Sequence, residues 1–205
     1  SDAGRTRRMA KRILRSPRWQ VALMKRTRMR DHAKRHLLEE GFCGLTLNHL
    51  AADQGCGRGK WNHYHSLDAV LVDVVRDHQA AIAERMTEAV LASRALEGPK
   101  RVEALTSALL DALDAERDGH RAATMILAGM PAVADPTRNH DCWLHGVFAE
   151  AIGGAKDERA VLARSLLTLI ENWAPRLEDA DADSRAMCAR LVTRMVTTGV
   201  PLTPR

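Results

Sequence analysis

The segment LLEEGFCGLTLNHLAADQGCGRGKW, residues 37–61, decides the fold of this chain. Gly41 follows the polar end of an apolar-periodic run and is expected to end a helix there. Thr46 is placed to cap a second, short helix, which we expect to end at Gly55. A third short helix is expected over residues 58–64. Two short helices separated by a glycine-containing turn are typical of a helix-turn-helix motif.

The apolar pattern is helical on both sides of this segment. Upstream, apolar residues recur at four-residue intervals and predict a helix from about Thr27, whereas Ser16 and Pro17 could begin a short helix before it. Downstream, Ser66 is placed to cap a long helix, and further helices follow at glycine and proline pairs. With no strand pattern and no repeat, the predicted fold class is all-α: an N-terminal three-helix helix-turn-helix head followed by a helical bundle.

Charge is distributed unevenly along the 205 residues. Residues 1–65 contain 15 Lys and Arg and 5 Asp and Glu, whereas residues 66–205 contain 16 and 21. A basic first third is typical of contact with a polyanion such as nucleic acid, although a solvated basic tail has the same composition. Only 3% of the residues are aromatic, while Ala, Leu, Val and Met are plentiful, which favours helices over sheets.

Composition also argues against several classes of protein. The four cysteines are scattered with no pair at C-x-x-C spacing, which disfavours a disulfide framework or zinc finger and fits a reducing cytoplasm. No uncharged run approaches the roughly 20 residues that cross a bilayer, so we expect no membrane contact. The sequence offers no nucleophile–base motif, no frame of paired carboxylates and no cofactor loop, so we expect neither an enzyme nor a cofactor.

The glycine-rich stretch GCGRGKWNHYH, residues 55–65, has two further interpretations. A phosphate-binding loop would need a glycine five positions before Gly59, where Gln54 stands. His63 and His65 are two residues apart, so on a helix they point in different directions and cannot easily share a metal ion. We therefore expect neither a phosphate loop nor a metal site here.

A second polar cluster, HDCWLH at residues 140–145, has the residue types of a metal site without the usual spacing. His140 and His145 are five positions apart. Asp141 and His145 are four positions apart, the spacing that places two ligands on one helix face. A polar patch beside a buried Trp143 is the favoured interpretation. The residues whose ligand role stays open are His140, Asp141, Cys142 and His145.

The head resembles the DNA-binding domain of the TetR family of transcriptional regulators. The matching residues are Gly41, Phe42, Thr46, Leu50, Ala51, Gly55 and Gly59. The long helix after Ser66 is similar to the family's connector to its ligand-binding body, and the motif content covers about a quarter of the chain. The resemblance implies a basic N-terminal arm at 1–26, a helix-turn-helix DNA-binding domain at 27–75, and a helical effector-binding and dimerisation domain at 76–205.

The recognition segment departs from the family pattern by one residue. Where the family has a tyrosine, an aromatic residue and a lysine at three-residue spacing, this chain has Asn62, His65 and Asp68. The aromatic residues Trp61 and Tyr64 lie one position earlier. An alternative interpretation is therefore a helical small-molecule or metal sensor whose head no longer recognises specific DNA.

The resemblance implies a set of DNA-contacting residues in the head. They are Thr46, Arg58, Gly59, Lys60, Trp61, Asn62, His63 and Tyr64. Arg58 and Lys60 would face phosphates or guanine edges, and Thr46 and Tyr64 would contact phosphate. The two polar side chains after Trp61 would read base edges, and Trp61 itself either contacts DNA or packs inside the head.

The resemblance also implies a homodimer on a double-stranded DNA operator, formed through the last two helices at about 157–178 and 182–199. The wide apolar surface of these helices would fit a second copy or the chain's own core. A small apolar or aromatic effector would bind in the body and release the DNA. The candidate pocket residues are Met125, Met130, Trp143, Phe148 and Trp173. Core packing is the competing interpretation for each of them.

Overall fold

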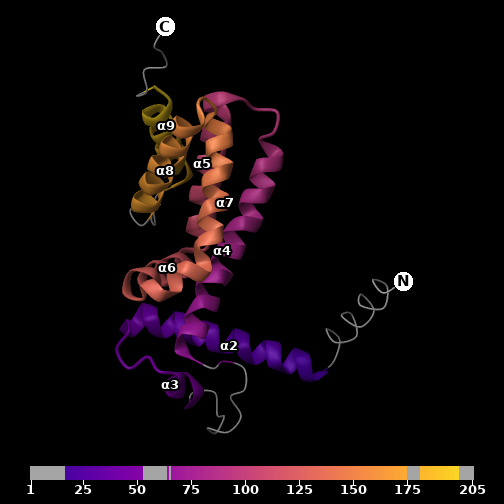
Figure 1. Cartoon of the computed structure of the whole chain (residues 1–205), viewed down its shortest axis with the longest axis vertical. Helices are drawn as coiled ribbons and strands as arrows, with labels where there is room; N and C mark the ends of the chain where they lie inside the picture. Colours follow the sequence, from indigo (N-terminus) through magenta and orange to yellow (C-terminus); the bar gives the residue numbers. More distant parts are fainter. Residues whose placement is uncertain (1–16, 53–63, 65, 175–180, 199–205) are drawn as a thin grey trace, which may run out of the picture. The chain divides into compact units, whose positions relative to one another are not determined.

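The computed structural model describes residues 17–52, 64, 66–174 and 181–198 (Figure 1). These residues form eight α-helices and one short 3-10 helix and contain no strand, which confirms the predicted all-α fold class. None of the described helices is long and apolar enough to cross a membrane. The elements are α2 (Pro17–Glu40), α3 (Leu47–Ala52), α4 (Leu67–Ala92), α5 (Gly98–Ala115), α6 (Arg117–Gly129), η1 (Pro131–Val133), α7 (Ala134–Ile152), α8 (Lys156–Trp173) and α9 (Ala182–Thr198).

The helices form two compact units. Unit 1 contains the described residues up to Val75 together with the segment Ala122–Val133, and unit 2 contains Arg76–Arg121 and the described residues from Ala134 onward. Helices α4 and α6 therefore each contribute residues to both units. Nothing in the sequence pattern indicates that the second half of α6 belongs with the helix-turn-helix region.

Helix α2 presents one apolar face to the core of unit 1. Met29, Ala33 and Leu37 are almost completely buried, at the four-residue spacing seen in the sequence. The helix begins at Pro17, where the sequence allows a short helix to start, and it continues without a break through the predicted start near Thr27. A proline is tolerated in the first turn because its missing N–H would have no intrahelical acceptor. The other buried members of this core are Leu45, Leu50, Tyr64, Val70, Leu71, Val74, Val75, Ala122, Ala123, Ile126 and Val133.

Local backbone features fix the connection from α2 to α3. Gly41 has a φ of +68°, a left-handed conformation that favours glycine, and its N–H donates a hydrogen bond to the carbonyl oxygen of Leu37 at 3.0 Å. The hydroxyl of Thr46 accepts a hydrogen bond from the N–H of His49 at 3.1 Å, so Thr46 caps α3. The predicted helix end and the predicted cap are both confirmed.

Helix α4 opens with a second cap of the same kind. The hydroxyl of Ser66 accepts a hydrogen bond from the N–H of Ala69 at 3.2 Å, as the sequence predicts. Asp68 lies in the first turn, where a negative charge interacts favourably with the helix dipole and stabilises the helix. The buried positions of the helix recur at intervals of three and four residues, which places them on one stripe, and are Val70, Leu71, Val74, Val75, His78, Gln79, Ile82 and Met86.

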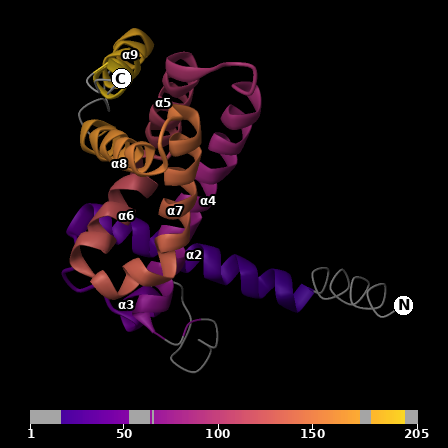
Figure 2. The same ribbon diagram turned by 45° about the horizontal axis from the view of Figure 1, so that its top comes forward.

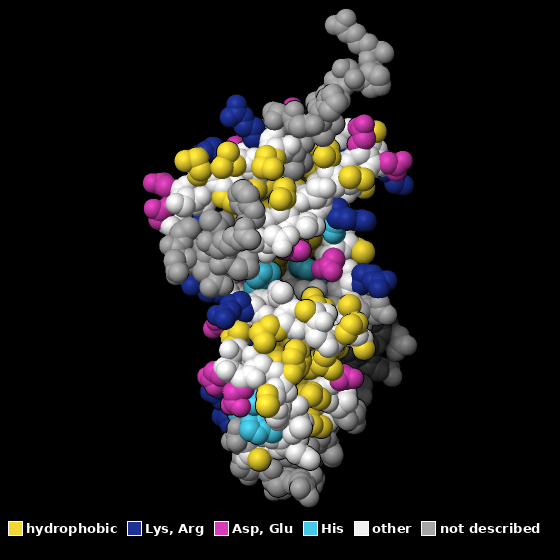
Figure 3. Space-filling view, turned by 90° about the vertical axis from the view of Figure 1, so that its left-hand side faces the viewer, with side chains coloured by type: hydrophobic (Ala, Val, Ile, Leu, Met, Phe, Trp, Pro, Cys, Tyr) yellow, Lys and Arg dark blue, Asp and Glu magenta, His cyan; other side chains and the backbone are white. Residues whose placement is uncertain are grey.

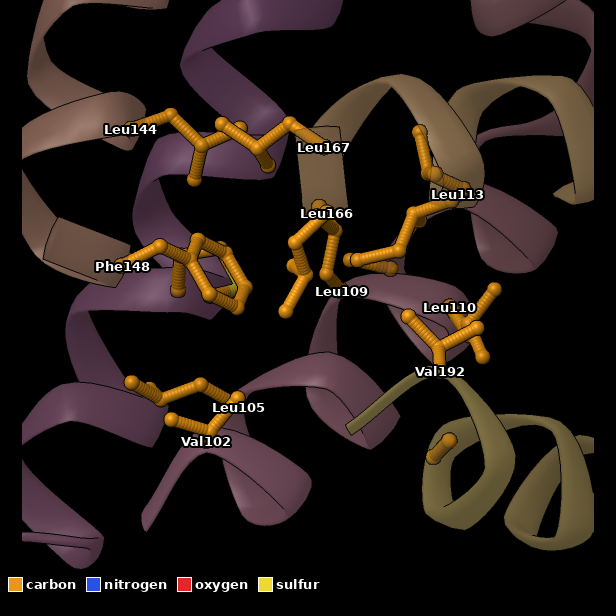
Figure 4. Packing of buried hydrophobic residues seen from close by; sticks show 14 of the residues in the cluster. Val102, Leu105, Leu109, Leu110, Leu113, Leu144, Phe148, Leu166, Leu167 and Val192 are labelled. Carbon is orange, nitrogen blue, oxygen red and sulfur yellow. The ribbon is translucent and has the colours of Figure 1, made fainter. Parts of the chain in front are cut away.

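Unit 2 is built around a separate hydrophobic core. Helices α5 and α8 each pack against both α7 and α9. Figures 1 and 2 both show α5 beside α7. The ring of Phe148 points toward Leu109 and Leu166, which come from α5 and α8 (Figure 4). Arg185 on α9 forms ion pairs with Asp111 and Asp114 on α5, at 3.4 Å and 3.5 Å, which fixes α9 at the edge of this core.

Candidate nucleic-acid interface

Two of the eight residues expected to contact DNA, Thr46 and Tyr64, are described by the structure. The other six lie outside the described residues and are Arg58, Gly59, Lys60, Trp61, Asn62 and His63. The described part of the candidate interface therefore consists of α2, α3 and the start of α4. Its geometry decides what Thr46 and Tyr64 do.

Thr46 lies exposed at the N-terminus of α3 and has a structural role there. Its hydroxyl oxygen accepts the hydrogen bond from His49 that caps the helix. The backbone N–H groups at a helix N-terminus also favour a nearby anion, so a phosphate contact is compatible with this cap. The phosphate contact of Thr46 stays a prediction, whereas its capping role is observed.

Thr46→Ala is expected to lower the free energy of unfolding by about 1 kcal/mol, because the N–H of His49 loses its acceptor. Thr46→Ser keeps the acceptor and is expected to stay close to the original protein. Urea denaturation followed by circular dichroism measures both. Equal midpoints for the alanine and serine variants would contradict the capping role.

Tyr64 is buried and does not present its hydroxyl to solvent. Only 4% of the residue is exposed, and its hydroxyl donates a hydrogen bond to Oδ2 of Asp73 at 2.7 Å. Burial is the main cause that raises the pKa of the phenol, Asp73 raises it further, and the nearby Arg26 opposes them. A buried hydroxyl that already donates to a carboxylate argues against the expected phosphate contact of Tyr64, which stays a prediction.

Arg26 completes a three-residue cluster that sequence analysis missed. Its Nη2 lies 2.5 Å from the same Oδ2 of Asp73, and its guanidinium carbon lies 4.9 Å from the centre of the Tyr64 ring. The hydrogen bonds to Tyr64 and Asp73 raise the pKa of Arg26. Asp73, next to the buried Val74 of α4, was the available signal, but its partner Arg26 is 47 residues away in the chain.

Helix α2 supplies the described positive charge of unit 1. Between residues 17 and 35 the chain carries seven Lys and Arg and a single acidic residue, Asp31. Arg28 and Arg35 are exposed, and Lys25 and Lys34 are partly exposed. Cations beside a helix-turn-helix motif provide the sequence-independent phosphate contacts that dominate DNA affinity.

Three histidines lie together where α2 meets α3. The rings of His36 and His49 have centroids 4.9 Å apart, and those of His32 and His49 are 5.9 Å apart. Nε2 of the buried His36 lies 2.7 Å from the carbonyl oxygen of Cys43, and because a carbonyl only accepts, this nitrogen carries the proton. Within the described ranges, no group of three His, Cys, Asp or Glu residues is arranged to hold a metal ion.

The expected effector-pocket residues have different surroundings. Phe148 is completely buried in the core of unit 2, and Met130 packs against the core of unit 1. Met125 is partly buried, and Trp143 is 37% exposed. The side chain of Trp173 lies outside the described residues. The structure therefore shows a core position for Phe148, and the effector contacts of the set stay a prediction.

The polar cluster at 140–145 has two partly buried imidazoles, His140 and His145, and two exposed polar side chains. The rings of His140 and Trp143 have centroids 5.9 Å apart. Burial lowers the pKa of His140, and the nearby carboxylate of Asp141 partly opposes this. Asp141 and Cys142 are exposed. Trp143 itself is 37% exposed, so the buried tryptophan expected beside this cluster is corrected, and a ligand role of the cluster stays open.

Helix α9 presents an apolar stripe to solvent. Met187, Leu191 and Met195 lie at four-residue intervals, which places them on one helix face, and all three are exposed. Val161 on α8 is exposed as well. Hydrophobic side chains gather over this part of unit 2 in the space-filling view (Figure 3). A stripe of this kind on a terminal helix is typical of a surface that binds another protein chain.

The fold is similar to solved bacterial regulators. No family model and no curated protein matches the sequence. A regulatory protein of the TetR family from Rhodococcus RHA1 superposes with a TM-score of 0.70 at 18% identity, covering 84% of this chain and 96% of that one. A putative TetR-family transcriptional regulator from Syntrophomonas wolfei str. Goettingen gives 0.68 at 11% identity, covering 88% and 98%. At such identities the similarity establishes the fold alone: this chain has the fold of the TetR-family regulators.

Proposed function

We propose that the protein is a DNA-binding transcriptional regulator that represses transcription and leaves its operator when a small-molecule effector binds. The observation that carries this proposal is the short helix α3 beside the cation-rich α2, in a chain with the TetR fold. Its α3 is capped by Thr46 and follows the cation-rich α2. The next segment, expected to be helical over 58–64, would enter the major groove of duplex DNA and read it with Arg58 and Lys60.

The regulator would act as a homodimer. The exposed stripe of α9, with Val161 of α8, offers the apolar surface for a second copy. Two-fold symmetry would then place two heads about 34–36 Å apart, the length of one turn of DNA. This arrangement predicts an operator with two related half-sites.

The effector would be a small apolar or aromatic molecule recognised by the helical body. Met125, Met130, Trp143 and Trp173 stay candidates for its contacts, and Phe148 is the candidate most firmly held in a core. Effector binding would favour a helix arrangement in which the two heads no longer match the operator spacing. The protein would be a cytoplasmic regulator without catalytic activity.

Sequencing of genomic fragments retained by the purified protein tests this function. The original protein is expected to recover a discrete set of fragments. Arg58→Ala with Lys60→Ala is expected to lower recovery by at least about tenfold, because each contact to a base or phosphate contributes about 1–3 kcal/mol. A matched variant with Arg94→Ala and Lys156→Ala removes two exposed cations of unit 2 and is expected to recover the original set. Equal recovery by all three proteins would overturn the assignment of the reading helix.

A second candidate function is a small-molecule or metal sensor without specific DNA recognition. The one-residue displacement of Trp61 and Tyr64 from the family pattern favours it. This candidate predicts that the original protein recovers no discrete set of fragments. The same sequencing experiment therefore separates the two functions.

A further inference from the structure

Arg26, Tyr64 and Asp73 form a closed cluster in unit 1. Oδ2 of Asp73 accepts a hydrogen bond from the Tyr64 hydroxyl at 2.7 Å and lies 2.5 Å from Nη2 of Arg26. The Arg26 guanidinium also lies over the Tyr64 ring at 4.9 Å. Each of the three residues therefore contacts the other two, and they come from α2, from the residue after segment 53–63, and from α4.

The position of Tyr64 in the chain gives this cluster its importance. Tyr64 is the last residue of the segment expected to read DNA, so whatever fixes Tyr64 fixes the end of that segment. The buried ring and the bond to Asp73 tie this point to α4, and Arg26 ties it to α2. Base contacts depend on such fixed positions far more than phosphate contacts do, because a misplaced side chain loses its hydrogen bonds to a base edge.

The cluster also changes the role of Arg26. By sequence, Arg26 is one of many cations in a basic region and would be assigned to phosphate. Its guanidinium is instead engaged by a largely buried carboxylate and by an aromatic face, although 44% of its side chain is exposed. A guanidinium committed in this way is poorly placed to bind a phosphate as well.

We propose that Arg26, Tyr64 and Asp73 are positioning residues that anchor the end of the DNA-reading segment and so support discrimination of the operator from other DNA. The inference rests on the proposed function, but the cluster itself is tested independently of DNA. The alternative, in which Arg26 contacts phosphate, predicts a different salt dependence.

The first experiment measures affinity for a recovered operator fragment and for a scrambled duplex at several salt concentrations. Tyr64→Phe and Asp73→Asn are each expected to lower the operator-to-scrambled affinity ratio about tenfold, with an unchanged salt slope, because neither removes a cation. Arg26→Gln is expected to lower the ratio similarly. Arg28→Gln, the matched loss of an exposed arginine on the same helix, is expected to weaken both duplexes equally and to reduce the slope by about one.

Two results would overturn the proposal. One is an unchanged affinity ratio in Tyr64→Phe and Asp73→Asn. The other is an Arg26→Gln variant that behaves like Arg28→Gln, which would make Arg26 a phosphate contact. If the original protein does not distinguish the two duplexes, the proposed function fails instead. Circular dichroism at the assay temperature confirms that each variant is folded.

The second experiment needs no DNA, because Tyr64 is the only tyrosine of the chain. Absorbance at the tyrosinate band follows its ionisation alone, and the folded protein is expected to titrate above the ordinary pKa of tyrosine. Asp73→Asn is expected to lower this pKa, since the carboxylate disfavours phenolate, and Arg26→Gln is expected to raise it, since the cation favours phenolate. Identical titrations in the three proteins would contradict the contacts of Tyr64 with Asp73 and Arg26.

The sign of the pH effect on stability follows from the same shift. Because the pKa of Tyr64 is higher in the folded state than in the unfolded state, the neutral phenol contributes to the free energy of unfolding. This contribution is complete below about pH 10 and is lost as the pH rises through the folded-state pKa. The original protein is therefore expected to lose thermal stability in this alkaline range. The Tyr64→Phe variant is expected to lose less thermal stability over the same pH range. An equal loss in both proteins would contradict the raised pKa of Tyr64.

Discussion

Leu191→Lys combined with Met195→Lys is expected to convert the proposed dimer to a monomer at micromolar concentration. The two side chains are 46% and 57% exposed and lie one helical turn apart on the apolar stripe of α9. Lysines there would have to be buried unpaired against the second copy, beside Arg190 and Arg194 of the same helix. The loss of apolar burial alone amounts to about 3 kcal/mol for two large side chains, which raises the dissociation constant more than 100-fold.

Sedimentation velocity over a range of concentrations measures this effect. Leu91→Lys is the matched control, because Leu91 is a large apolar residue of unit 2 with 57% exposure that lies on α4, away from the stripe in sequence. It is expected to sediment like the original protein. An original protein that is monomeric at every concentration, or a double variant that still dimerises, would refute the role of α9.

Phe148→Ala is expected to lower the free energy of unfolding by about 3–5 kcal/mol. The ring is completely buried among leucines of α5 and α8, and its removal leaves a cavity in addition to the lost transfer energy (Figure 4). Such a loss is a large fraction of the stability of a small domain and could unfold unit 2 at physiological temperature. Urea and thermal denaturation measure it.

Trp143→Ala provides the comparison on the same helix. Trp143 is partly exposed, so its removal creates a smaller cavity and is expected to destabilise the protein much less than Phe148→Ala. If Phe148→Ala instead destabilises the protein by under about 1 kcal/mol, Phe148 lines a space that tolerates change. That result would strengthen its candidacy as an effector contact.

The elements that sequence analysis predicted well are those fixed by neighbours in the chain. Thr46 and Ser66 cap helices because a hydroxyl and a backbone N–H three residues on are adjacent in any chain that starts a helix there. Gly41 ends α2 because only glycine adopts that backbone conformation readily. The buried stripe of α4 follows from helical periodicity alone.

The features that escaped prediction depend on residues distant in sequence. Arg26 and Asp73 are 47 residues apart, and each had a simpler explanation, as a solvated cation and as a polar helix position. Tyr64 looked like a phosphate contact because its hydroxyl is polar, and only the tertiary structure shows that this hydroxyl donates a hydrogen bond to the carboxylate of Asp73. Periodicity identifies a buried face but cannot identify its partner.

Because the segment Ala122–Val133 belongs to unit 1, the chain cannot be divided into its two units by a single cut. A fragment that stopped after Val75 would lack part of the wall of its own hydrophobic core. The missing residues would be Ala122, Ala123, Ile126 and Val133. A chimera that joins unit 1 to the second unit of another protein would therefore need to keep those four residues at the equivalent positions of that protein.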